Sequence, residues 1–98
     1  MSLSTQDLKN IFDLALHNHR RGNFKKAEKL YNKILKNFPD HFQSIFLLGT
    51  LFAQVKNYKE AITLLNKAIR IAHKASLQQS QDDFEAVEDV LQAVGRTA

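Results

Sequence analysis

Four histidines are the side chains of this 98-residue sequence with the widest chemical range, because imidazole binds metals and transfers protons near neutral pH. His17 and His19 are two residues apart, so on a helix they point to different faces, whereas helical metal sites place histidines four apart. His41 and His73 lie elsewhere, without paired carboxylates nearby. Since the chain also lacks cysteine, we expect no metal site and interpret the histidines as surface or groove residues.

No motif brings together a nucleophile and a base, as an enzyme active site requires. Gly22, Gly49 and Gly95 are scattered, so the sequence contains neither a phosphate-binding glycine loop nor a nucleophile elbow. The acidic run at residues 82–89 lacks the alternation and the central glycine of a calcium loop. We therefore predict a protein without catalytic activity and without a cofactor.

Charge is distributed unevenly along the chain. Residues 1–74 contain 13 Lys and Arg against 5 Asp and Glu, whereas residues 75–98 contain 1 Arg against 5 Asp and Glu. Many of the basic residues lie close together in sequence: Arg20, Arg21, Lys25, Lys26, Lys29, Lys33 and Lys36. This cluster is typical of a solvated helix exterior, and the alternative is a binder of nucleic acid or an anionic surface. We do not expect nucleic acid as the partner, because Phe24, Tyr31 and Phe38 belong to the apolar face and are not interleaved with the cations.

Membrane and export signals are missing from the residues of this sequence. The longest apolar stretches, such as residues 45–48, are far shorter than the roughly 20 residues of a membrane-spanning helix. The first residues have neither the basic nor the apolar region of a signal peptide. We expect one domain over residues 1–98, in the cytoplasm, without a membrane span.

Apolar residues recur at helical spacing in the first part of the chain: Leu8, Ile11, Phe12, Ala15 and Leu16. Gly22 and Asn23 end this pattern, because glycine permits left-handed backbone and the Asn side-chain oxygen is expected to cap the next helix. That second helix should end before Pro39, which lacks an amide donor. Asp40 is the expected cap of a third helix, with Gln43 as its capping-box partner.

The same pattern returns 34 residues later. Residues 23–27, Asn-Phe-Lys-Lys-Ala, align with residues 57–61, Asn-Tyr-Lys-Glu-Ala, and Leu14 aligns with Leu48. Small residues recur where paired helices must approach closely: Ala15, Ala27, Gly49, Ala61 and Ala68. The period predicts two helix–turn–helix repeats, at residues 8–41 and 42–75.

This period and its residues resemble the tetratricopeptide-repeat family. The second unit matches the family pattern at Ile45, Leu48, Gly49, Phe52, Tyr58, Ala61 and Ala68, and the first at Leu14, Ala15, Gly22, Phe24, Ala27, Tyr31 and Pro39. The departures are Asn18, Lys56, Leu65 and His73, and the missing proline at His73 indicates that the fourth helix continues past its expected end. The resemblance implies an all-α fold, a right-handed solenoid of two repeats.

A third repeat is not expected, because Asp82 and Asp83 occupy the place of the family's Leu-Gly pair. After a polar linker at residues 76–81, Ser80 is the predicted start and Gly95 the predicted end of a helix over residues 80–95. Its apolar stripe should cover the last repeat and its acidic face should meet water: Phe84, Val87, Val90, Leu91 and Val94 form the stripe. We therefore predict a C-terminal capping helix.

In the family that the sequence resembles, the first helix of each repeat lines a concave surface. The corresponding inward positions are Lys9, Phe12, Leu16, His19 and Arg20 in the first repeat, and Gln43, Phe46, Thr50, Ala53 and Gln54 in the second. Members that clamp a terminal carboxylate have polar and basic residues where Phe12, Leu16 and Thr50 stand here. The resemblance therefore implies an adaptor that binds a peptide or a partner protein's helix in an apolar groove, and not a carboxylate clamp.

Two alternatives stay open at this point. Phe12, Leu16 and Phe46 are either groove residues, or core residues, or residues covered by the C-terminal helix, because a short solenoid has little core otherwise. Since two repeats are also fewer than a solenoid usually needs, a homo-oligomer is a second expectation beside a protein or peptide partner.

Overall fold

The computed structural model describes residues 3–75 and 81–97, and within them helices are joined by short turns and no strand is present, as the sequence predicts. Five helices follow one another: α1 (Thr5–Arg20), α2 (Phe24–Asn37), α3 (Phe42–Gln54), α4 (Tyr58–Ala75) and α5 (Gln81–Thr97). The helix α4 continues past His73, as the missing proline indicated. Of the predicted linker, residues 76–80 lie outside the described residues, as does the predicted start at Ser80, and Gln81 already belongs to α5.

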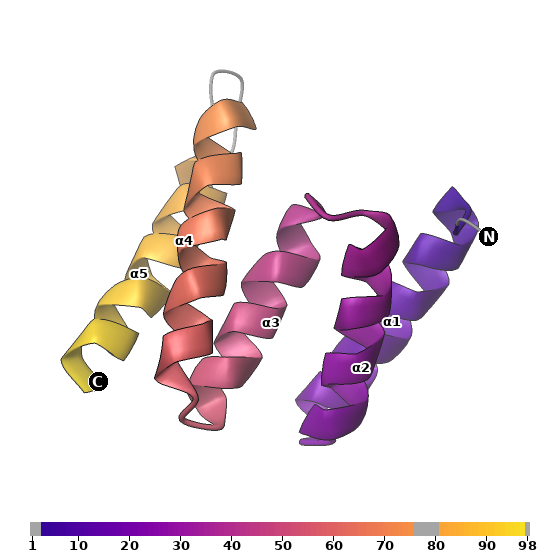
Figure 1. The fold of residues 1–98 in the computed structure, drawn as a ribbon, viewed down its shortest axis with the longest axis horizontal. Coiled ribbons are helices and arrows are strands. Elements are labelled where there is room, and N and C mark those ends of the chain that lie inside the picture. The colour runs from indigo at the N-terminus through magenta and orange to yellow at the C-terminus, as the bar shows by residue number, and fades with distance from the viewer. Residues whose placement is uncertain (1–2, 76–80, 98) are drawn as a thin grey trace.

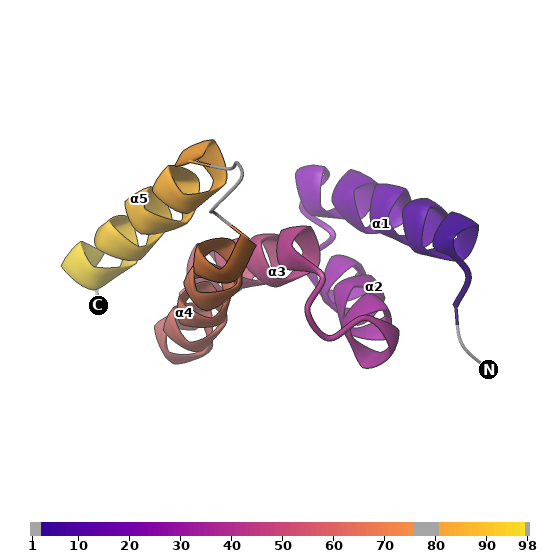
Figure 2. The ribbon, with the colours of Figure 1, turned by 90° about the horizontal axis from the view of Figure 1, so that it is seen from above.

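The helices are stacked side by side in two rows (Figures 1 and 2). In Figure 2, α1, α3 and α5 form one row, and α2 and α4 form the other. Each helix packs mainly on its neighbours in sequence, and α5 packs on α4 while also touching α3. The C-terminal helix therefore occupies the place that the first helix of a further repeat would take.

The two turns inside the helix pairs have the same backbone geometry. Gly22 and Lys56, which are 34 residues apart, both adopt positive φ angles, of 81° and 68°. In the first turn the Asn23 amide donates to the Asn18 carbonyl at 2.8 Å, and in the second the Asn57 amide donates to the Phe52 carbonyl at 2.8 Å. The repeat in the sequence is thus a repeat in hydrogen bonding, although only the first turn has the glycine that left-handed backbone favours.

Three predicted helix ends are wrong in detail. Asn23 precedes α2, but its side chain makes no capping bond and instead donates to Asn18 Oδ1 at 3.2 Å. The cap of α3 is His41 and not Asp40, because residues 39 and 40 form the turn and His41 Nδ1 accepts from the Ser44 amide at 3.3 Å. Gly95 does not end α5, which continues to Thr97, since Gly95 lacks the positive φ of a helix-ending glycine.

The core runs through the stack as two adjoining clusters of buried side chains. One cluster joins the first helix pair to α3: Ala15, Ala27, Tyr31, Leu48 and Leu51. The other joins α3, α4 and α5: Ile45, Ala61, Leu65, Ala68, Val87 and Val94. Where α3 crosses α4, a Cβ atom on Gly49 would lie 3.0 Å from Leu65 Cγ, so any larger residue at this position requires the Leu65 side chain to shift.

Candidate functional site

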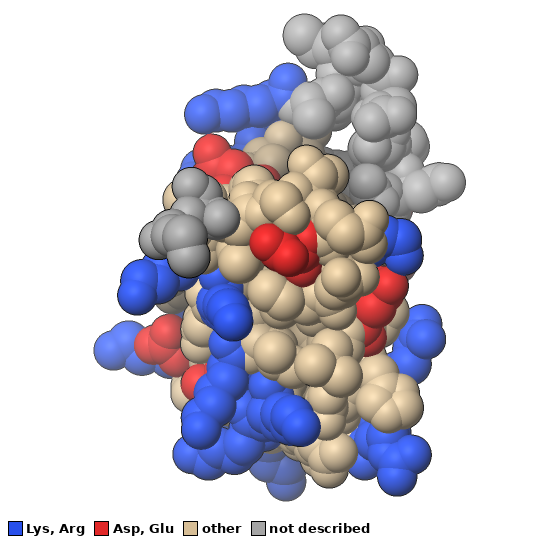
Figure 3. Space-filling model, turned by 90° about the vertical axis from the view of Figure 1, so that its right-hand side faces the viewer, with Lys and Arg blue, Asp and Glu red and all other residues tan. Residues whose placement is uncertain are grey.

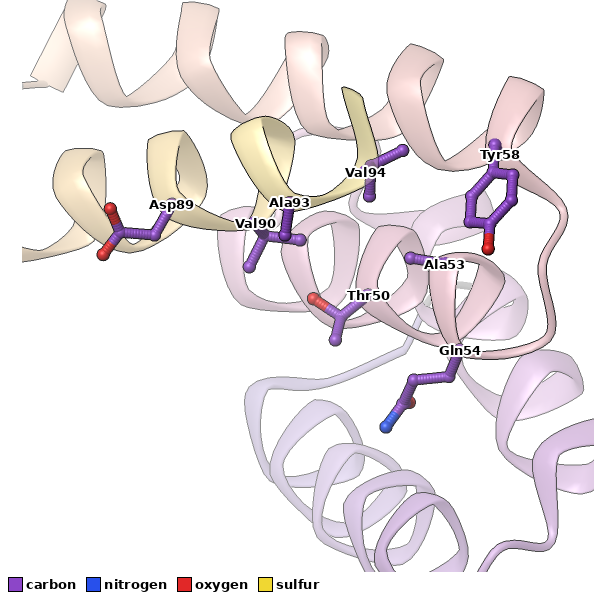
Figure 4. Close-up of a pocket in the computed structure, with 8 residues that line it drawn as sticks. All are labelled: Thr50, Ala53, Gln54, Tyr58, Asp89, Val90, Ala93 and Val94. Atoms are coloured by element: carbon purple, nitrogen blue, oxygen red, sulfur yellow. The ribbon is translucent and has the colours of Figure 1, made fainter. Parts of the chain in front are cut away.

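A groove of about 360 Å³ opens between α3, the first turn of α4 and the C-terminal half of α5 (Figure 4). Eight residues line it: Thr50, Ala53, Gln54, Tyr58, Asp89, Val90, Ala93 and Val94. The structure therefore brings together three of the ten predicted site residues, Thr50, Ala53 and Gln54, with five residues that sequence analysis did not assign to a site. Seven of its eight lining residues belong to α3 and α5, and the eighth, Tyr58, belongs to α4.

The walls of this groove are mostly apolar. Ala53, Val90 and Ala93 supply methyl groups, and the Thr50 hydroxyl is already occupied as a donor to the Phe46 carbonyl at 2.9 Å. The polar groups left at its edges are the Gln54 amide, the Tyr58 hydroxyl and the Asp89 carboxylate. Such a surface suits an apolar side chain with a few hydrogen bonds at its rim.

His19 does not line a free surface, contrary to the sequence-based interpretation. Its side chain is 9% exposed, and both ring nitrogens have partners: Nδ1 lies 2.9 Å from the Tyr31 hydroxyl and Nε2 lies 2.6 Å from Gln54 Oε1. Because Gln54 Oε1 can only accept, Nε2 carries the proton and Nδ1 accepts from Tyr31. This chain of bonds links α2, α1 and α3, and it fixes the orientation of an amide that lines the groove.

Aromatic rings close around His19. Phe24 and Tyr31 each meet its ring edge-on, with centroids 5.8 Å apart in both pairs. Burial raises the pKa of Tyr31 to about 12 and outweighs the opposite effect of the Arg20 charge, so the hydroxyl stays protonated and donates to His19. A hydrogen-bonded aromatic cluster of His19, Phe24 and Tyr31 therefore connects the first helix pair to α3 through Gln54.

The other predicted positions are split between solvent and packing. Arg20, Gln43 and Lys9 are exposed, and Lys9 forms an ion pair with Asp13 at 3.0 Å. Three of the apolar positions, Phe12, Leu16 and Phe46, are half-buried.

Phe12 packs against the first core cluster and Phe46 packs against the second. Of the alternatives stated above for these two residues, the structure therefore favours packing against the core. The Phe12 ring meets His41 edge-on at 5.6 Å, and the Phe46 ring stacks on Phe42 at 6.1 Å. Neither phenylalanine lines the groove between α3 and α5.

The remaining histidines show no metal-binding arrangement. His41 is half-buried, caps α3 and contacts Ser44 Oγ at 2.7 Å, while burial lowers its pKa from the usual 6.5. The interpretation of all histidines as surface or groove residues is therefore wrong for His19, which is buried, whereas His41 is half-buried. Within residues 3–75 and 81–97, no three His, Cys, Asp or Glu side chains gather as metal ligands would, and no helix is long and apolar enough to cross a membrane.

The basic cluster between residues 20 and 36 is exposed throughout. Figure 3, which faces the α1–α2 side, shows many Lys and Arg side chains gathered toward the end where α1 passes into α2. Phe24 and Phe38 are half-buried and Tyr31 is buried, so these aromatic rings do not form the exposed stacking platform that a single-stranded nucleic acid would use.

Comparisons with known proteins agree with this architecture. The sequence matches the tetratricopeptide-repeat family over residues 7–74, whereas the comparison with curated proteins gives no match. A crystal structure of a tetratricopeptide repeat domain protein from Salinibacter ruber has a TM-score of 0.81 at 19% identity, covering 93% of this chain and 98% of that chain. A solution structure of such a domain protein from the same organism has a TM-score of 0.77 at 20% identity, covering 94% and 90%.

A chain of the CopN–Scc3 complex is also similar in structure. Its TM-score is 0.71 at 14% identity, and the match covers 94% of this chain and 61% of that chain. At these low identities the solved structures show a shared fold and nothing finer.

Proposed function

Because this chain belongs to the tetratricopeptide-repeat family, whose domains generally mediate protein–protein interactions and are not catalytic, we propose that it binds a partner protein through the groove between α3 and α5. The observation that carries the proposal is the groove itself, with apolar walls and a volume of about 360 Å³. A surface hollow of this kind accepts apolar side chains from a peptide or helix.

The proposed partner segment presents one or two apolar side chains beside a hydrogen-bond acceptor. The apolar side chains would contact Ala53, Val90 and Ala93. The Gln54 amide nitrogen is the natural donor to the partner, because His19 already occupies Oε1 and no described residue accepts from that nitrogen. A backbone carbonyl of an extended peptide, or a side-chain amide on a helix, would satisfy it.

The groove lacks the cations of a carboxylate clamp. Among its lining residues the charged side chain is Asp89, an anion, so a terminal carboxylate would meet repulsion there. We therefore propose an internal segment of the partner and not its C-terminus. A cytoplasmic location and self-association remain predictions beside this proposal.

The proposal is tested by a substitution that fills the groove and by its effect on peptide binding. Peptides selected from a display library on the wild-type protein would be measured by isothermal titration against Ala53→Leu. The added leucine atoms project into the groove, so affinity should fall about tenfold or more. Asn66→Leu is the matched control, because Asn66 is exposed on α4 outside the groove and gains a leucine without narrowing it.

Circular dichroism should show that both variants keep the wild-type helix content. Equal peptide affinity for the wild type and Ala53→Leu would remove the α3–α5 groove from the account. Equal weakening by Ala53→Leu and Asn66→Leu would show that the peptides bind some other part of the surface.

A further inference from the structure

The row formed by α2 and α4 carries most of the positive charge. These two helices contain nine Lys and Arg residues against two Glu, whereas α3 contains no charged residue and α5 contains five acidic residues against one Arg. The cations recur at the 34-residue period: Lys25 and Lys59, Lys33 and Lys67, Lys36 and Arg70. Charge is thus segregated between the two rows of the fold, with the cations on the row opposite the groove.

One pocket on this row gathers three of the cations. It has a volume of about 200 Å³ and lies between α4 and the turn that joins α2 to α3, lined by Asp40, Lys67, Arg70, Ile71 and Lys74. Residues 67, 70, 71 and 74 share one face of α4 because they are three or four apart. Lys67 Nζ donates to the Pro39 carbonyl at 3.0 Å, which holds this side chain over the turn.

The stability of the helix does not account for these cations. Lys74 lies in the last turn of α4, where a cation interacts favourably with the helix dipole. Lys67 and Arg70 lie further inside α4, and like charges at such spacing destabilise a helix slightly. Lys67, Arg70 and Lys74 form no ion pair with any residue of the described ranges, and neither does Asp40.

The charge balance points to a doubly charged anion. Three cations against the Asp40 carboxylate leave an excess of two positive charges in the pocket. A phosphate monoester carries nearly two negative charges at neutral pH and three acceptor oxygens, whereas a carboxylate carries one charge and two oxygens. Arg70 suits a phosphate group further, because guanidinium donates two parallel hydrogen bonds to such an oxyanion.

We propose that the pocket formed by Asp40, Lys67, Arg70 and Lys74 binds a phosphate monoester on a side chain of a partner protein. The proposal does not depend on the α3–α5 groove, because the two sites share no residue. A partner whose phosphorylated residue is joined to its groove-binding segment by a linker long enough to span the two rows would then gain a second contact, and phosphorylation would control the interaction.

The experiment is an NMR titration of the whole chain with a glycine-flanked phosphoserine peptide and its unphosphorylated form. Saturable amide shifts at Asp40 and residues 67–74 are expected from the phosphopeptide alone. Arg70→Gln should weaken binding about tenfold, as expected for the loss of a charge-assisted bidentate contact. Lys36→Gln is the matched control, since Lys36 takes the same place in the first repeat but lies outside the pocket, and it should change affinity less than twofold.

Three outcomes would overturn the proposal. Equal weakening by Arg70→Gln and Lys36→Gln would show general charge attraction and no built site. If inorganic phosphate binds as tightly as the phosphopeptide, the pocket recognises phosphate itself and not a phosphorylated side chain of a partner protein. Random-sequence single-stranded DNA that binds more tightly, with shifts spread over α2 and α4, would identify the row as a nucleic-acid surface instead. Ala53→Leu should leave phosphopeptide binding unchanged.

Discussion

Equivalent repeat positions carry different side chains in two places along the row of α1, α3 and α5: where α1 faces α3, and where α3 faces α5. Between α1 and α3 stands His19, bonded to Tyr31 and Gln54 and enclosed by Phe24. At the position 34 residues later stands Ala53, beside Tyr58, and the space between α3 and α5 remains open as the groove. At equivalent positions of the two repeats, the first therefore has a buried imidazole that bonds across to α3, and the second has a methyl group that lines the groove.

A second contrast concerns the faces at which a preceding repeat would pack. Leu48 and Leu51 of α3 are buried against the first repeat, with exposures of 2% and 1%. Their counterparts in α1 are Leu14, which is 46% exposed, and His17, which is exposed. The outer face of α1 therefore offers one apolar side chain where the equivalent face of α3 offers a packing surface.

The largest expected effect on stability comes from removing the buried His19 side chain. His19→Ala removes a buried ring and leaves the Tyr31 hydroxyl without its acceptor, so the free energy of unfolding should fall by about 3 kcal/mol. Urea denaturation measures this change. His17→Ala, on the exposed side of the same helix, should change stability by less than about 0.5 kcal/mol. Equal effects would mean that the His19 network contributes little.

The next effect is a pH dependence that only the first repeat carries, since Leu65 replaces Tyr31 in the second. The pKa of Tyr31 is raised from 10.0 to about 12 in the folded chain, so the unfolded chain loses its proton first as pH rises. The contribution of Tyr31 to the free energy of unfolding is fully present below pH 10, and it falls by about 2 kcal/mol as the pH rises to 12. Melting temperatures of the wild type and Tyr31→Phe between pH 9 and pH 12 test this, and parallel curves would contradict it.

A smaller effect comes from the close crossing of α3 and α4. Alanine occupies this position in the first repeat as Ala15, but in the second a Cβ on Gly49 would lie 3.0 Å from Leu65 Cγ. Gly49→Ala should therefore lower the free energy of unfolding by about 1 kcal/mol, because overpacking outweighs the gain in helix propensity. Chemical denaturation measures it, and an increase in stability would show that Leu65 moves aside freely.

The smallest effect concerns the two turns with positive φ. Lys56→Gly places glycine where Gly22 already stands in the first repeat, so it should stabilise the chain by about 0.5 kcal/mol. The reverse substitution, Gly22→Lys, should destabilise by about 1 kcal/mol. Thermal unfolding measures the stability of both variants. A loss of stability in Lys56→Gly would mean that the contacts of the Lys56 side chain stabilise the fold by more than its positive φ destabilises it.

The sequence predicted those parts of the structure that depend on local spacing. The 34-residue period yields the paired helices, Gly22 ends α1 in a left-handed turn, and the missing proline at His73 lets α4 continue. The capping of α3 by His41 was missed because an imidazole nitrogen is a less common cap than the carboxylate of Asp40 beside it.

The site was harder to predict because its residues meet only in three dimensions. The bond between His19 and Gln54 joins residues 35 positions apart, and no local pattern reports it. Val90 and Ala93 reach the groove from α5, which follows the repeats out of register, so the period cannot place them. The repeat could have indicated Tyr58 as a groove residue. Tyr58 is the counterpart of Phe24, whose ring contacts His19, and His19 is the counterpart of Ala53 in the groove.

The most direct test of the account is the position of a bound peptide relative to the α3–α5 groove. Intermolecular NOEs between a display-selected peptide and protein methyl groups locate it without any substitution. We expect NOEs to the methyl groups of Ala53, Val90 and Ala93, and none to Leu16 of α1, which does not line the groove. NOEs concentrated on Leu16 or Leu14, with none to Ala53, would contradict the claim that the partner binds in the α3–α5 groove.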